Sequence, residues 1–111
     1  RCHVVQGGIL KNKKGINLPD VAVSAPALTD QDREDARFSL SLGVDYLALS
    51  FVRHASDIVE LRALIVDSGA AADTAIIAKI EKPEALEQLT EIVAAAEGVM
   101  VPLSSVGWCA P

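Results

Sequence analysis

A lysine and a glutamate two positions apart, Lys79 and Glu81, are the residues of this sequence best suited to chemistry. They close an apolar, β-branched run over residues 75–81 that is typical of a buried strand. Because strand side chains alternate between faces, the two charged side chains are predicted to point to the same side. A rigid pair of this kind could bind an anionic group through the ammonium and a divalent cation through the carboxylate.

The same pair has a second interpretation, in which it forms an ion pair at a solvated strand end and has no further role. Placing two opposite charges at the end of a buried strand costs free energy, and this favours the interpretation in which the pair has a function. Structural ion-pair networks occur at such places too. Ser50 and Phe51 end an earlier apolar segment, where they could join the same site or simply pack. Residue type and spacing leave these alternatives open.

Hydrophobic periodicity divides the chain into alternating strands and helices. Thr29 and Asp32 have the form of a capping box, which predicts that a helix begins near residue 30. Pro83 suits the first turn of a later helix, which we expect to bury a face of larger apolar residues. That face consists of Leu86, Leu89, Ile92 and Val93. The predicted strands cover residues 2–10, 46–52, 75–81 and 98–101, and the predicted helices cover residues 30–42, 56–67 and 83–96.

Strands that alternate with helices at this spacing predict right-handed βαβ units and a parallel sheet, so the expected fold class is α/β. Few aromatic and many aliphatic residues agree with buried parallel strands. In such a sheet Lys79 and Glu81 would stand at the carboxyl end of one strand, and Ser50 at the carboxyl end of the strand beside it.

Charge, apolar runs and cysteine spacing argue against nucleic acid, membrane and zinc as partners of this chain. The formal net charge of −5 argues against a nucleic-acid-binding domain, which would carry a basic stripe. No apolar run is long enough to span a bilayer, and no basic-then-apolar signal segment is present, so no membrane partner is expected. Cys2 and Cys109 lack the spacing of a zinc site. The expected location is the cytoplasm, with reduced thiols.

Five stretches in the right order resemble the pyruvate kinase family. They are Gly7–Gly8 followed by the KGINLP segment at 14–19, the PALTDQD turn at 26–32, the GVDYLALSFVR segment at 43–53, the AIIAKIEKP segment at 75–83 and the GVMV segment at 98–101. A complete (β/α)8 barrel takes about 250 residues. The resemblance therefore implies a partial (β/α)8 TIM barrel, about two and a half βα units with parallel strands. It also implies three parts: residues 1–23 end an inserted small β domain and return from it, 24–101 form the partial barrel, and 102–111 are a divergent tail.

The resemblance implies roles for three residues. Lys79 is expected to be catalytic and to bind substrate, offsetting negative charge on the transferring phosphoryl group and the enolate oxygen. Glu81 is expected to be a ligand of Mg²⁺. Ser50 is expected to lie at the substrate. The parent reaction would be phosphoryl transfer from phosphoenolpyruvate to ADP in glycolysis, giving pyruvate and ATP and dependent on Mg²⁺ and K⁺, in a homotetramer.

The sequence departs from the family pattern after Val101. Where the family has an Arg-Gly-Asp run, this chain has Leu103, Ser104 and Ser105. A serine hydroxyl cannot replace the charge that an aspartate offers to a hard dication. The K⁺ ligands and the ADP site are also expected to lie outside the chain, so we expect the isolated chain to be inactive. Two alternatives remain: another Mg²⁺-dependent pyruvate or phosphoenolpyruvate barrel enzyme, such as a carbon–carbon lyase, and a non-catalytic truncated fragment.

Overall fold

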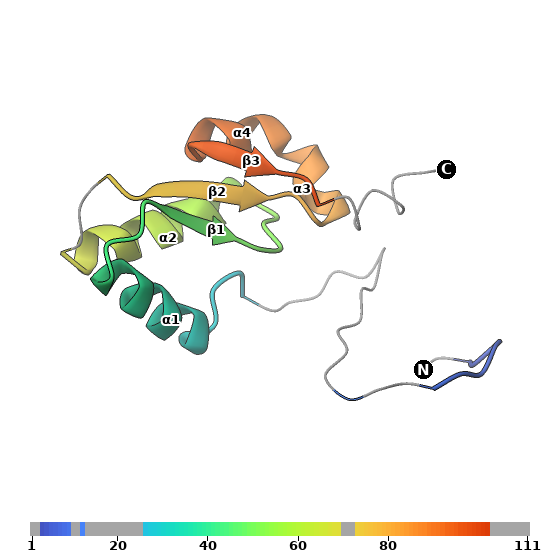
Figure 1. The fold of residues 1–111 in the computed structure, drawn as a ribbon. Helices are drawn as coiled ribbons and strands as arrows, with labels where there is room; N and C mark the ends of the chain where they lie inside the picture. The colour runs from blue at the N-terminus through green and yellow to red at the C-terminus, as the bar shows by residue number, and fades with distance from the viewer. Residues whose placement is uncertain (1–2, 10–11, 13–25, 70–72, 103–111) are drawn as a thin grey trace.

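The computed structural model of the chain describes residues 3–9, 12, 26–69 and 73–102. The predicted tail at 102–111, apart from Pro102, and most of the expected part at 1–23 lie outside these residues. The described elements alternate as the sequence predicts (Figure 1). In chain order they are α1 (Asp30–Ser41), β1 (Tyr46–Leu49), α2 (Ala55–Asp67), β2 (Ala75–Lys79), α3 (Pro83–Glu87), α4 (Leu89–Ala95) and β3 (Gly98–Met100).

The three strands form one parallel sheet in the order β1-β2-β3. Leu47 pairs with Ile76 and Leu49 with Ala78, and on the other side of β2 Lys79 pairs with Met100. The predicted α/β class and the parallel pairing are therefore confirmed. The strands themselves are shorter than predicted.

The helices cover one face of the sheet. Ile76, Ala78 and Ile80 alternate along β2 and just beyond it, are fully or nearly buried, and join the core formed with α2 and α4. Figure 1 shows α2 and α4 behind the three strands, and α1 beside α2 below them. The intervening residues of β1 and β3 on the other face, such as Tyr46 at 66% exposed and Met100 at 47%, are covered by no described helix. Among the described residues, helices thus cover only one side of the sheet.

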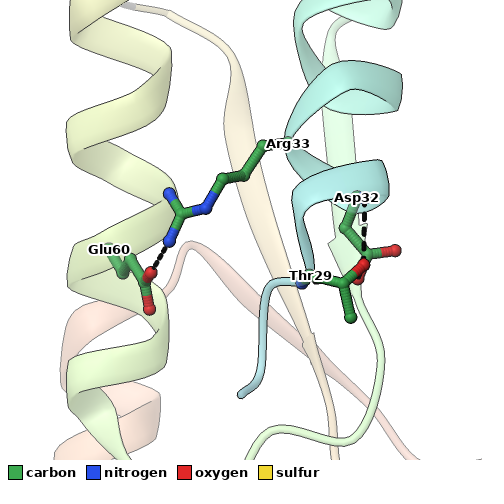
Figure 2. Close-up of polar contacts among 4 residues, drawn as sticks. All are labelled: Thr29, Asp32, Arg33 and Glu60. Atoms are coloured by element: carbon green, nitrogen blue, oxygen red, sulfur yellow. Dashed lines mark hydrogen bonds and ion pairs between the residues drawn. The ribbon is translucent and has the colours of Figure 1, made fainter.

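Local sequence explains the start of α1. The Thr29 hydroxyl accepts from the Asp32 amide at 3.2 Å, and the Asp32 carboxylate accepts from the Thr29 amide at 2.9 Å (Figure 2). This reciprocal capping satisfies two amides that the first helical turn leaves without partners. The Thr29 hydroxyl also donates to the Asp32 carboxylate and lowers the pKa of that group. The predicted capping box is confirmed.

Two sequence predictions are wrong. Residues 3–9 of the strand predicted over 2–10 form no strand. The helix predicted over 83–96 is two short helices, separated at Gln88, whose backbone leaves the helical region. Nothing in the local sequence explains this break. Their buried face is Ala85 and Ile92, not Leu86, Leu89 and Val93, which are exposed.

Candidate functional site

The structure brings the three predicted site residues together at the carboxyl ends of β1 and β2. Leu49 pairs with Ala78, so the next residues along each strand, Ser50 and Lys79, stand opposite one another. The Lys79 ammonium donates to the Ser50 hydroxyl at 2.9 Å. It also lies 3.3 Å from Oε1 of Glu81. All three side chains are on the face that the helices leave uncovered, because Lys79 and Glu81 alternate with the buried Ala78 and Ile80, and Ser50 follows the buried Leu49.

A fourth residue, Phe51, completes the group through its backbone. Its amide donates to Oε2 of Glu81 at 3.0 Å. Its φ of 57° places it in the left-handed region, the one non-glycine residue there among the described residues. That conformation costs a bulky residue on the order of 1–2 kcal/mol. We call Ser50, Phe51, Lys79 and Glu81 the carboxyl-end cluster.

The Phe51 ring does not offset this cost by burial, since 57% of the residue is exposed. The Lys82 ammonium lies 5.5 Å from the ring centroid, within range of a cation–π interaction worth about 0.5–1 kcal/mol at an exposed site. A hydrogen bond to a charged group adds about 1.5–3 kcal/mol. Both interactions tie the segment after β1 to the segment after β2.

The Lys79–Glu81 pair is partly shielded from solvent, with side chains 24% and 12% exposed. Salt therefore screens this pair less than a surface pair. An ammonium has three donors, of which Ser50 and Glu81 take two. The third donor can reach an anionic group bound at this end of the sheet. The arrangement is thus a preorganised positive charge of the kind that stabilises developing negative charge.

The cluster does not amount to a magnesium site. No group of three His, Cys, Asp or Glu side chains able to hold a metal occurs among the described residues. Glu81 supplies one carboxylate, and both of its oxygens already have partners in Lys79 and Phe51. Mg²⁺ requires near-octahedral oxygen coordination, so Glu81 could be one ligand and no more.

A cleft of about 380 Å³ lies between α1 and the free edge of β1. Ser50 and Phe51 reach one side of it, and Asp32, Asp35 and Ser39 of α1 reach the other. Lys79 and Glu81 are not among its lining residues. The cleft therefore neighbours the carboxyl-end cluster without containing its charged groups.

Two other charged groups, which were not predicted from the sequence, stabilise the elements that support the site. Asp57 is buried and accepts from the amides of Arg53 and His54 at 2.9 and 3.1 Å, which caps α2. Arg62 of α2 binds the carboxylate of Glu97, which also accepts from the Ile76 amide at 2.7 Å. The Arg62 guanidinium holds the pKa of Glu97 below its ordinary value. A capping signal at Asp57 was available in the sequence, whereas the Arg62–Glu97 pair joins distant segments.

Comparison with known proteins agrees with the motifs. A family profile described as "Pyruvate kinase, barrel domain" matches residues 1–111. The chain belongs to the pyruvate kinase family. Over 104 residues it is 46% identical to the pyruvate kinase of Geobacillus stearothermophilus, covering 94% of this chain. It is 45% identical over 106 residues to that of Agrobacterium vitis and 40% identical over 107 residues to that of Staphylococcus aureus, in each case over 96% of this chain.

The predicted family resemblance is therefore confirmed, and the fold it accompanies is an α/β unit with three parallel strands. The chain spans only 18% to 21% of the length of these pyruvate kinases. None of the described helices is both long and apolar enough to cross a membrane. The roles of Ser50, Lys79 and Glu81 stay predictions, although the three side chains do meet.

Proposed function

We propose that this chain is a central piece of a pyruvate kinase barrel, contributing about two and a half βα units and part of the phosphoryl-transfer site. The parent reaction would move a phosphoryl group from phosphoenolpyruvate to ADP, giving pyruvate and ATP. The observation that carries the proposal is the placement of Lys79 beside Ser50 and Glu81 at the carboxyl ends of adjacent parallel strands, in a chain of this family. In barrel enzymes the active site lies at that end.

The uncovered face of the sheet supports the partial barrel. In a closed barrel this face would point to the interior and be filled by side chains from the other strands. Both edge strands, β1 and β3, have only one neighbour among the described residues. The missing strands of the longer relatives would pair with these edges and cover Tyr46 and Met100.

Phosphoryl transfer depends mostly on positioning and on stabilising charge, so a fixed ammonium is a suitable catalytic group. Lys79 would direct its remaining donor to the transferring phosphoryl group or to the enolate oxygen. Ser50 would hold the ammonium in place and line the substrate. Glu81 would be one of several ligands of Mg²⁺ in the parent, and K⁺ would be held by residues outside the chain.

A chimera tests the proposal. Residues 26–101 would replace the matching segment of the Geobacillus stearothermophilus pyruvate kinase, whose remaining strands complete the barrel. We expect turnover of phosphoenolpyruvate and ADP, and at least a ~100-fold loss on Lys79→Ala, in line with the removal of one charge-stabilising donor. Arg37→Ala, which removes an exposed cation of α1, is the matched control and should leave turnover unchanged. A folded chimera without turnover, or one indifferent to Lys79→Ala, would contradict the proposal.

A further inference from the structure

We infer that Phe51 is a positioning residue, whose left-handed backbone directs its amide to Glu81 and so keeps that carboxylate from closing fully on Lys79. The inference deepens the proposed function, on which it rests for the use made of Lys79. It concerns the backbone of Phe51 and not its ring.

The geometry divides the Glu81 carboxylate between two partners. Oε2 accepts from the Phe51 amide at 3.0 Å, and Oε1 lies 3.3 Å from the Lys79 ammonium. A carboxylate without the amide could turn both oxygens to the ammonium, which is the nearest cation. By holding one oxygen, the amide leaves a Lys79 donor available for an anionic ligand.

The left-handed backbone at Phe51 lets the chain turn after β1 while the Phe51 amide faces Glu81. Its φ of 57° turns the chain sharply after β1, while the next residue, Val52, is fully buried. The ring is mostly exposed, so burial of the ring does not impose the turn. Strained backbone conformations of this kind cluster at functional sites, where the surrounding structure maintains them.

Substitutions at position 51 can separate backbone from ring. Glycine adopts positive φ at no steric cost and asparagine tolerates it, so Phe51→Gly and Phe51→Asn keep the conformation and remove the ring. Valine is β-branched and disfavours positive φ, so Phe51→Val opposes the conformation. NMR on the 111-residue chain would measure hydrogen-exchange protection of the amide at position 51 and the carboxylate ¹³C shift of Glu81.

We expect the Gly and Asn variants to keep both signals, with protection within about twofold of the original, because their backbone still presents the amide. Protection should fall about tenfold or more in Phe51→Val and in Glu81→Gln, which removes the charged acceptor. Lys82→Met removes the cation from the ring and should leave both signals unchanged. Phosphate titration adds a second measurement: the affinity for inorganic phosphate should fall in Phe51→Val and persist in Phe51→Gly.

The opposite order would overturn the inference. If folded Phe51→Gly and Phe51→Asn lose protection and Phe51→Val retains it, the ring and not the backbone holds Glu81. The Gly and Asn variants decide the matter even if Phe51→Val fails to fold. These signals do not depend on turnover, so an inactive chimera with an intact amide–carboxylate bond would remove the proposed function and leave the positioning role standing.

Discussion

Glu97 shows how one surface carboxylate can hold three parts of the fold. It accepts from Arg62 of α2 and from the amide that begins the core of β2, while Arg62 also donates to the Thr74 carbonyl at 3.1 Å. These bonds lie at the amino end of the sheet, opposite the carboxyl-end cluster. They fix the start of the strand whose end carries Lys79.

Acid should weaken the fold through this carboxylate. The pKa of Glu97 is lowered in the folded chain by its bond to Arg62, so the unfolded chain binds the proton more readily. The contribution is complete above the ordinary pKa of 4.5 and is lost as pH falls from there through the lower folded pKa. Chemical denaturation from pH 7 to 3 should show a shallower loss of stability in Glu97→Gln.

Glu91→Gln, which alters an exposed acid of α4, is the control and should follow the original chain. An equal pH slope in the Glu97→Gln variant would contradict the prediction. Because the Glu97 side chain is about half exposed, solvent and salt limit the size of the effect.

At the scale of single residues, the sequence predicted side-chain placement where it depends only on the two-residue period of a strand. Lys79 and Glu81 could be placed on one side because residues two apart share a face. The left-handed backbone of Phe51 could not be foreseen, because bulky residues adopt it only when tertiary contacts compensate. The Phe51 amide was therefore missed as a member of the site.

Two neighbouring isoleucines of β2 lie on opposite faces of the sheet, so their truncation should have different effects on stability. Ile76 is completely buried against the helices, whereas Ile77 is half-buried on the uncovered face. We expect Ile76→Ala to cost about 2–5 kcal/mol of unfolding free energy, as deletions in a packed core do. Ile77→Ala should cost less than Ile76→Ala, because Ile77 is only partly buried and faces away from the helices. Urea denaturation of both variants would measure the difference, and equal costs would contradict the assignment of faces.

The helices α1 and α2 are joined by an ion pair between Arg33 and Glu60 (Figure 2). Both side chains are about a third exposed, so the pair should contribute little. A double-mutant cycle with Arg33→Met and Glu60→Gln should give a coupling of about 0.2–1 kcal/mol that shrinks between 0.05 and 1 M salt, where screening lengths shorten to about 3 Å. A coupling well above this range, or one unaffected by salt, would contradict the prediction that this pair behaves as a solvent-exposed ion pair.

Element positions could be predicted because their signals are local. The Thr29–Asp32 capping box and the apolar spacing of α2 both depend on residues within a turn or two of one another. The helix after Pro83 was predicted less well because its buried face depends on which neighbours exist. In this chain α4 packs against α2, and Ala85 and Ile92 take the core positions.

At the scale of the whole molecule, the isolated chain should have no measurable pyruvate kinase turnover. It offers one carboxylate, Glu81, and no group of metal-binding side chains among its described residues. It would also lack the site for the acceptor, which must be aligned with the phosphoryl group. Such alignment can lower the activation barrier by about 7–11 kcal/mol. A coupled assay with phosphoenolpyruvate, ADP, Mg²⁺ and K⁺ would test this against a Lys79→Ala chain. Turnover clearly above that variant would show that the piece carries a working site.

The sequential order of the parallel strands has a consequence for how the chain folds during synthesis. Each strand pairs with the strand that follows it in the chain, so no strand waits for a distant partner. On a ribosome, β1 and α2 would leave the exit tunnel before β2 docks beside them, and β3 would add last. Each new βα unit would meet an edge already formed by the previous one. Translation would thus extend this sheet in one direction only, by adding each new strand to the edge formed by the strand before it.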